Sequence, residues 1–359
     1  MKPTQELHDL GQSLWVDNIT RDMLDEGTLE GYIRDLSVTG LTSNPTIFDK
    51  AISAGHDYDE QINELREQGL EPEPLFFELA IADLRRAADL FKGVHEETDT
   101  VDGFVSLEVS PKLAYDTEAT TRQAAELHAH AERDNVFIKI PGTEAGLPAI
   151  EESIFAGIPI NVTLLFDSAQ HLAAADAYMK GIERRVDAGL DPDVRSVASL
   201  FMSRWDVAVA DEVPAELKNQ LGLAIGKRAY AAYRELLESD RTKKLEQAGA
   251  RPQRLLWAST GTKDPEASDT LYIEGLAAPD TINTMPDKTL LAFADHGKVG
   301  EPLPADGGDG EEVLARFEEA GIGIDALAAR LQQEGADAFV KSWDDLTGSI
   351  SREAEKLAG

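Results

Sequence analysis

Short apolar runs with the alternation of β-strands recur along the chain, and amphipathic segments separate them. Eight runs of this kind occupy residues 13–19, 37–44, 103–110, 135–141, 157–166, 195–201, 254–259 and 280–286. The intervening segments include 117–134 and 221–240, where apolar positions recur with the period of a helix. Strands that alternate with helices favour parallel β/α units, and eight such units close a (β/α)8 TIM barrel. A doubly wound sheet is the alternative architecture.

Two parts of the chain are longer than a simple barrel requires. About fifty residues separate the second and third runs, and the patterns at 59–68 and 74–93 predict additional helices there. An acidic loop at 301–312 follows the eighth run and precedes another helical pattern. We therefore expect one α/β domain over residues 1–359, with a helical C-terminal extension from about residue 287.

Polar side chains fall on the inward face of several predicted strands. Successive side chains on a strand point to opposite faces, so that Asp17 shares a face with Trp15 and Lys139 shares a face with Phe137. The polar residues that this rule directs into the barrel are Asp17, Thr42, Asn44, Glu108, Lys139, Asn161 and Thr163. All of them lie near the C-terminal ends of their strands, where TIM-barrel enzymes have their active sites.

Each of these residues also has a structural explanation. Asp17 or Asn44 could cap the segment that follows, Thr163 could be an ordinary strand residue, and Glu108 with Lys139 could be a buried ion pair. Their convergence from five strands on one end of a barrel favours a functional site over separate structural roles.

Lys139 is the most informative of them, because it interrupts the apolar run "NVFIKIP". A lysine amine is almost entirely protonated at pH 7, and it attacks a carbonyl only when burial or cationic neighbours favour its neutral form. Phe137, Ile138 and Ile140 would supply that burial. A Schiff base formed there would stabilise a neighbouring carbanion, and Asp17 and Glu108 could transfer the protons that such a reaction needs.

Composition and charge restrict the alternatives. The chain has no cysteine, which excludes disulfides, thiolate catalysis and Cys-ligated metals, and its seven histidines are scattered, so we expect no metal and no cofactor. The formal net charge of −33 argues against nucleic acid or an anionic membrane as partner. No apolar run is long enough to span a membrane and the N-terminus has no secretory pattern, so a cytoplasmic location is expected.

Six motifs taken together resemble those of the transaldolase family. They are "WVDNIT", "GLTSNPTIF", "SLEVSP", "FIKIPGT", "NVTLLF" and "SLFMSRWD", in this order between about residues 13 and 260. The resemblance implies a barrel of the class I aldolase type and a transferase of the non-oxidative pentose phosphate pathway. It would transfer a dihydroxyacetone unit from fructose 6-phosphate or sedoheptulose 7-phosphate to erythrose 4-phosphate or glyceraldehyde 3-phosphate.

The resemblance also implies a role for each matching residue. Lys139 would form the Schiff base, Asp17 would transfer a proton, and Glu108 would act through a water that Thr163 also holds. The residues that would bind the substrate are Thr42, Asn44, Asn161, Ser199 and Arg204. Lys263 lies in the region where many members carry a second arginine for the phosphate, and it supplies a point charge instead of a bidentate fork.

Two other functions remain open at the level of sequence. A related lysine aldolase would release free dihydroxyacetone, and an inactive barrel would serve as an acidic binding scaffold. The expected partners are small sugar phosphates, and the expected assembly is a monomer or a homodimer.

Overall fold

Eight parallel strands form a closed barrel in the computed structural model, which describes residues 1–358. Each strand pairs with the next in sequence, and β8 pairs with β1. The strands are β1 (Ser13–Asp17), β2 (Val38–Thr42), β3 (Val105–Glu108), β4 (Val136–Pro141), β5 (Ile160–Leu165), β6 (Ser196–Phe201), β7 (Arg254–Ala258) and β8 (Thr281–Met285). Every strand lies within a predicted run, so the TIM barrel is confirmed and the doubly wound alternative is wrong.

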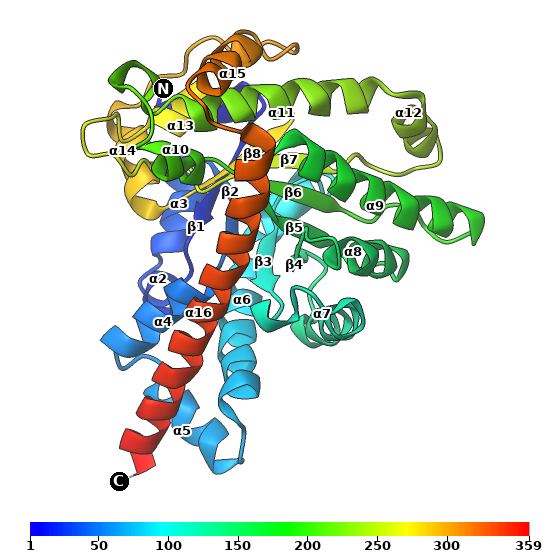
Figure 1. The fold of residues 1–359 in the computed structure, drawn as a ribbon. Helices are drawn as coiled ribbons and strands as arrows, with labels where there is room; N and C mark the ends of the chain where they lie inside the picture. Colours follow the sequence, from blue (N-terminus) through cyan, green and yellow to red (C-terminus); the bar gives the residue numbers. More distant parts are fainter. Residues whose placement is uncertain (359) are drawn as a thin grey trace.

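Helices surround the barrel and connect consecutive strands (Figure 1). Before β6 they are α1 (Pro3–Asp9), α2 (Arg21–Asp25), α3 (Thr28–Leu36), α4 (Pro45–Ala54), α5 (Asp59–Glu67), α6 (Pro72–Glu97), the 3₁₀ turn η1 (Pro111–Leu113), α7 (Thr117–Ala131), α8 (Gly146–Phe155) and α9 (Ser168–Asp187). After β6 they are α10 (Ser203–Val209), the 3₁₀ turn η2 (Ala215–Leu217), α11 (Leu221–Glu238), α12 (Asp240–Gln247), α13 (Leu271–Gly275), α14 (Asp287–His296), α15 (Gly310–Glu319) and α16 (Ile324–Ala358).

The additional helices occur where the sequence predicted them. Helices α5 and α6 belong to the long connection between β2 and β3, and α14, α15 and α16 follow β8. Helix α16 has 35 residues and crosses in front of the strands in Figure 1. It packs against α4, α5 and α6, which places the end of the chain beside the additional helices near its start.

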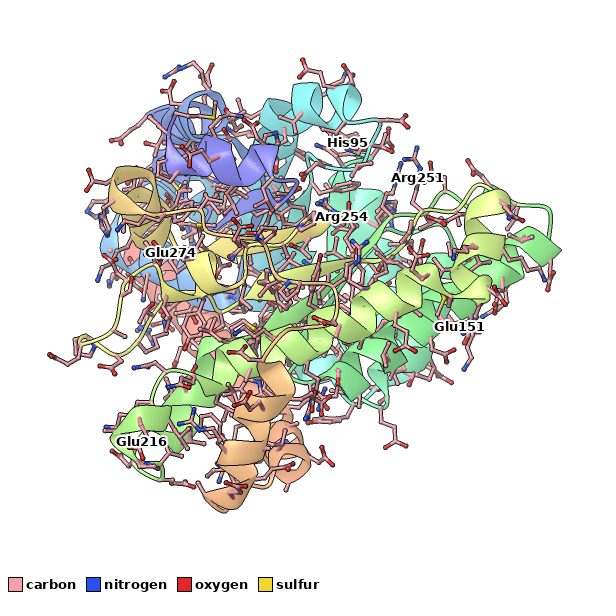
Figure 2. All side chains as sticks on the ribbon, turned by 90° about the horizontal axis from the view of Figure 1, so that it is seen from above. His95, Glu151, Glu216, Arg251, Arg254 and Glu274 are labelled. Carbon is pink, nitrogen blue, oxygen red and sulfur yellow. The ribbon has the colours of Figure 1, made fainter. Side chains whose placement is uncertain are left out.

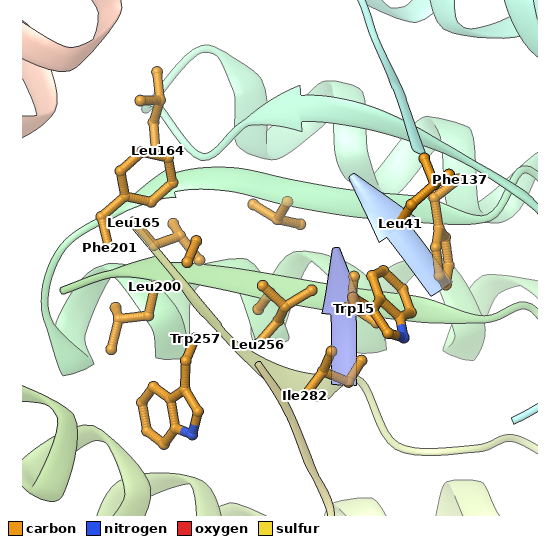
Figure 3. Packing of buried hydrophobic residues seen from close by; sticks show 14 of the residues in the cluster. Trp15, Leu41, Phe137, Leu164, Leu165, Leu200, Phe201, Leu256, Trp257 and Ile282 are labelled. Atoms are coloured by element: carbon orange, nitrogen blue, oxygen red, sulfur yellow. The ribbon is translucent and has the colours of Figure 1, made fainter. Parts of the chain in front are cut away.

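Aromatic side chains fill the barrel below the polar residues. The rings of Trp15 and Phe137, both labelled in Figure 3, have centroids 6.2 Å apart, and Phe137 stacks on Phe104 at 4.0 Å. Trp15 fits because residue 40 is glycine, where a Cβ atom would lie 2.5 Å from the indole ring. Asp17 and Lys139 lie two residues further along the same strands. The aromatic layer therefore lies directly below the polar residues of the site.

Charged side chains are spread over the outside of the molecule (Figure 2). Arg254, at the start of β7, donates hydrogen bonds to Ser13 Oγ at 2.7 Å and to the Thr281 carbonyl at 3.1 Å. It therefore ties the N-terminal ends of β7, β8 and β1 together. Within residues 1–358, no helix is both long enough and apolar enough to cross a membrane.

Candidate active site

Lys139 lies at the C-terminal end of the barrel, on β4, and its side chain is buried. Its Nζ donates to the carbonyl oxygen of Ser43 at 3.1 Å and lies 3.4 Å from Glu108 Oε2. The register of the sheet explains the second contact, because Glu108 on β3 is the direct neighbour of Lys139. Only 7% of the lysine side chain and 5% of the glutamate side chain are exposed, so the two charges interact with little screening by water.

Asp17, at the end of β1, has a hydroxyl partner on the neighbouring strand. Thr42 Oγ1 donates to Asp17 Oδ1 at 2.8 Å and lies 2.7 Å from Thr284 Oγ1 on β8. Burial raises the pKa of Asp17, whereas the positive charge of Lys139 and the hydrogen bond from Thr42 lower it, and burial dominates. A carboxylate with a raised pKa exchanges a proton more readily near neutral pH than an ordinary aspartate.

Glu108, on the strand next to Lys139, is in a similar environment. Burial raises its pKa and outweighs the charge of Lys139, which lowers it. Its Oε1 atom and the hydroxyl of Thr163 on β5 are both buried, and neither has a hydrogen-bond partner within residues 1–358. Buried polar atoms are normally satisfied, so these two atoms have hydrogen-bonding capacity for a ligand or a water molecule.

A second group of hydrogen bonds orients the polar residues of β5 and β6. Ser199 Oγ donates to Asn161 Oδ1 at 2.7 Å, and Asn161 Nδ2 donates to Ser106 Oγ at 3.2 Å. These contacts fix the direction of the Asn161 amide. Asn44 has the capping role that the sequence left open, because its Oδ1 accepts from the backbone N–H of Ile47 at 3.2 Å and begins α4.

All ten residues predicted for the site lie together at this end of the barrel. A cavity of about 350 Å³ opens there. The predicted residues that line it are Asp17, Thr42, Asn44, Lys139, Thr163, Ser199, Arg204 and Lys263. Glu108 and Asn161 lie against these residues through their contacts with Lys139 and Ser199.

The cavity also has walls that the sequence analysis missed. Thr284 lines it from β8, and Ala338, Phe339 and Ser342 line it from α16. Thr284 shares its strand face with the apolar Ile282, whereas the polar Asn283 lies on the opposite face, so strand parity alone did not single out Thr284. No pattern in the sequence indicated where α16 docks.

The cavity is positively charged in part, although the chain carries a net charge of −33. Lys50, Arg204 and Lys263 line it, and none of them has an ion-pair partner among residues 1–358, where most other basic side chains meet a carboxylate. Cations without a carboxylate partner around a cavity of this size are suited to binding a small anion. The arrangement therefore combines a buried amine, two acid–base groups and an anion site.

A buried lysine with two carboxylates nearby, at the C-terminal mouth of an eight-stranded parallel barrel, is the arrangement of Schiff-base-forming aldolases of class I. The chain belongs to the transaldolase/fructose-6-phosphate aldolase family, which it matches over residues 14–350.

Individual transaldolases match this chain in sequence along nearly their whole length. The chain is 44% identical over 365 residues to the transaldolase of Thermobifida fusca, with 99% of this chain and 98% of that protein covered. It is 44% identical to the transaldolase of Mycobacterium marinum, with 97% and 96% covered, and 42% identical to transaldolase 2 of Streptomyces coelicolor, with 99% and 98% covered. The resemblance based on six motifs is thus confirmed, together with the transaldolase function and the transferase class that it implied.

Proposed function

We propose that this protein transfers a dihydroxyacetone unit from a ketose phosphate to an aldose phosphate through an imine on Lys139. The donor is fructose 6-phosphate or sedoheptulose 7-phosphate, and the acceptor is erythrose 4-phosphate or glyceraldehyde 3-phosphate. The single observation that supports this most directly is the buried Lys139 amine between Glu108 and the Ser43 carbonyl, at the wall of a cavity large enough for a sugar phosphate.

Imine formation requires a neutral amine and a proton donor for the departing hydroxyl. Glu108 is 3.4 Å from Nζ and takes the ammonium proton, which frees the amine to attack C2 of the ketose. The same carboxyl returns the proton, through a water held by Thr163, to the carbinolamine hydroxyl that leaves as water. The raised pKa of Glu108 suits this exchange in both directions.

Carbon–carbon cleavage requires a base at a different position. Asp17 removes the proton of the C4 hydroxyl, the C3–C4 bond breaks, and the aldose phosphate leaves. The electron pair of that bond moves into the protonated imine, which becomes an enamine of dihydroxyacetone. An acceptor aldehyde then adds to C3 by the reverse sequence, and hydrolysis of the new imine restores Lys139.

The remaining cavity residues bind the substrate. Asn44 and Asn161 hold the hydroxyl groups of the dihydroxyacetone unit, while Thr42 and Ser199 line the pocket beside it. Arg204 and Lys263 bind the phosphate group. Neither cation has an ion-pair partner within residues 1–358, so a sugar phosphate in the cavity would give each of them a direct partner.

We further propose that the chain is a single transaldolase-type domain in the cytoplasm. The packing of α16 on α4 and its contribution to the cavity wall support the first part, because the C-terminal extension is then part of the same functional unit. Sugar phosphates of the pentose phosphate pathway, which are cytoplasmic metabolites, support the second.

Borohydride trapping tests the proposal. The protein is incubated with fructose 6-phosphate, reduced, digested and mapped by mass spectrometry, and we expect a stable sugar adduct on Lys139. Lys139→Arg should give no adduct and no turnover while the far-UV circular dichroism is unchanged, because a guanidinium stays protonated. An adduct on another lysine, or full activity of the Lys139→Arg variant, would refute the proposal. Release of free dihydroxyacetone in place of transfer to an added aldose would favour the aldolase alternative.

A further inference from the structure

Arg204 lies at the cavity against two aromatic rings, and the charge of Glu108 acts on it without a direct ion pair. Its Cζ atom lies 5.0 Å from the ring centroid of Phe201 and 5.8 Å from that of Phe339. Within residues 1–358, the Arg204 side chain makes no hydrogen bond and no ion pair. Rings attract a guanidinium through its faces, so they leave the N–H donors in its plane available to a ligand.

The two rings come from different parts of the chain. Phe201 is the last residue of β6, where Figure 3 labels it among the buried residues, whereas Phe339 belongs to α16. Helix α16 therefore supplies one of the two rings that contact Arg204.

Three residues on one face of α16 contact this region. Gln332, Gly335 and Phe339 are spaced i, i+3 and i+7, which places them on the same side of a helix. Gln332 Nε2 donates to the carbonyl oxygens of Gly142 at 3.1 Å and Leu164 at 2.9 Å. The helix is thereby fixed to the segments that end β4 and β5, one turn before it meets Arg204.

The guanidinium of Arg204 packs closely against α16 at Gly335. A Cβ atom at this position would lie 3.1 Å from Arg204 Nη1 and 3.0 Å from Leu164 Cδ2. Glycine is unfavourable inside a helix, so its presence in the middle of α16 has a cost for helix stability. The close approach of Arg204 is a physical reason for a residue without a side chain.

We propose that Gly335 and Phe339 are positioning residues, which direct the guanidinium of Arg204 toward the cavity and so determine the preference for phosphorylated sugars. This inference rests on the proposed function, in which Arg204 binds the phosphate. It assigns phosphate recognition jointly to α10, which carries Arg204, and to α16.

The test compares fructose 6-phosphate with fructose as donor, at saturating acceptor, in four single variants. Phe339→Leu keeps apolar volume but removes the ring, and Phe339→Tyr keeps the ring. Gly335→Ala adds the obstructing Cβ atom, and Lys341→Ala is a control on the same helix with a side chain that is 79% exposed.

Phe339→Leu and Gly335→Ala should raise KM for fructose 6-phosphate about 5- to 30-fold, since a partly buried cation–π contact or its geometry is lost. Their kcat/KM for fructose should remain within about twofold of the parent. Phe339→Tyr and Lys341→Ala should behave like the parent with both sugars. In the Arg204→Ala background, Phe339→Leu should have no further effect on either sugar, because residues that act through one group are not additive.

Several results would overturn the inference. They are equal losses with both sugars, a parent-like KM for fructose 6-phosphate in both Phe339→Leu and Gly335→Ala, or an undiminished effect of Phe339→Leu in the Arg204→Ala background. Circular dichroism checks that each variant is folded. If Phe339→Leu does not fold, the same comparison is made with Gly335→Ala alone and in the Arg204→Ala background. Failure of the proposed function is a separate result, because the parent would then form no borohydride-trapped adduct on Lys139 with either sugar.

Discussion

Replacement of His171 by leucine is expected to flatten the dependence of stability on pH. His171 lies on α9 and is completely buried, and neither Nδ1 nor Nε2 has a hydrogen-bond partner within residues 1–358. Its ring meets the ring of Tyr233 edge-on at 6.0 Å. Burial lowers the pKa of His171 to about 4, because the imidazolium would lose its hydration without gaining a counter-charge.

The sign and size of the effect follow from the two states. In the unfolded chain the pKa of a histidine is about 6.5, so below that pH the unfolded state binds a proton that the native state does not. Stability therefore falls as the pH decreases from about 6.5 to about 4, below which the native state is protonated too. At about 1.4 kcal/mol for each pKa unit, the total loss is about 3 kcal/mol. Above pH 7, the leucine variant should be at least as stable as the parent, because it buries no unpaired polar atom.

Urea unfolding, followed by circular dichroism between pH 4.5 and 8, measures this effect. The many acidic groups of the chain also titrate in this range, but they are common to both proteins and cancel in the difference between parent and variant. That difference should grow by about 2–3 kcal/mol from pH 8 to pH 4.5, in favour of the variant. Parallel profiles for the parent and His171→Leu would refute the reasoning.

The remaining predictions concern the chemistry at Lys139. Asp17→Asn should still form the imine but stall before cleavage, so borohydride should trap the full six-carbon sugar phosphate, and a three-carbon adduct at normal speed would contradict this. Glu108→Gln should slow adduct formation itself by about 10²- to 10⁴-fold in rapid-quench trapping, and parent-like trapping would argue against its role. Thr42→Val removes a hydrogen bond that lowers the pKa of Asp17, so the acid limb of kcat should move to higher pH, whereas an unchanged limb would show that another group controls it. Activity should survive dialysis against EDTA, because the imine acts as the electron sink, and a loss restored by a divalent ion would contradict the mechanism.

The strands and most of the cavity could be predicted because both depend on local alternation. A period of two identifies a strand and also states which side chains share its face, so Asp17, Glu108 and Lys139 could be directed toward one another before their distances were known. The rule loses accuracy where a strand is irregular. The register between β5 and β6 shifts between Val162 and Leu165, and Leu164 has a φ of 59°, which no alternation pattern reveals.

The position of α16 could not be predicted for a different reason. Its periodicity shows that it is a helix with an apolar face, but the surface that this face covers is determined by long-range packing. The hydroxyl of Thr46 donates a hydrogen bond to Ser342 Oγ, which is 296 residues away in the sequence. The hydroxyl of Ser349 donates to Asp49 Oδ1, which is 300 residues away. Phe339 therefore had no signal that would connect it with Arg204, although both residues were present in the same sequence.

The position of α16 after the eighth strand has a consequence for biosynthesis. When β8 has been synthesised, all eight strands and Lys139 are present, so the barrel can close while the chain is still growing. Gln332, Gly335 and Phe339 are synthesised later, so the wall beside Arg204 is completed only after the strands are in place. Proteolytic removal of α16 would accordingly take away one wall of the cavity while leaving every strand of the barrel intact.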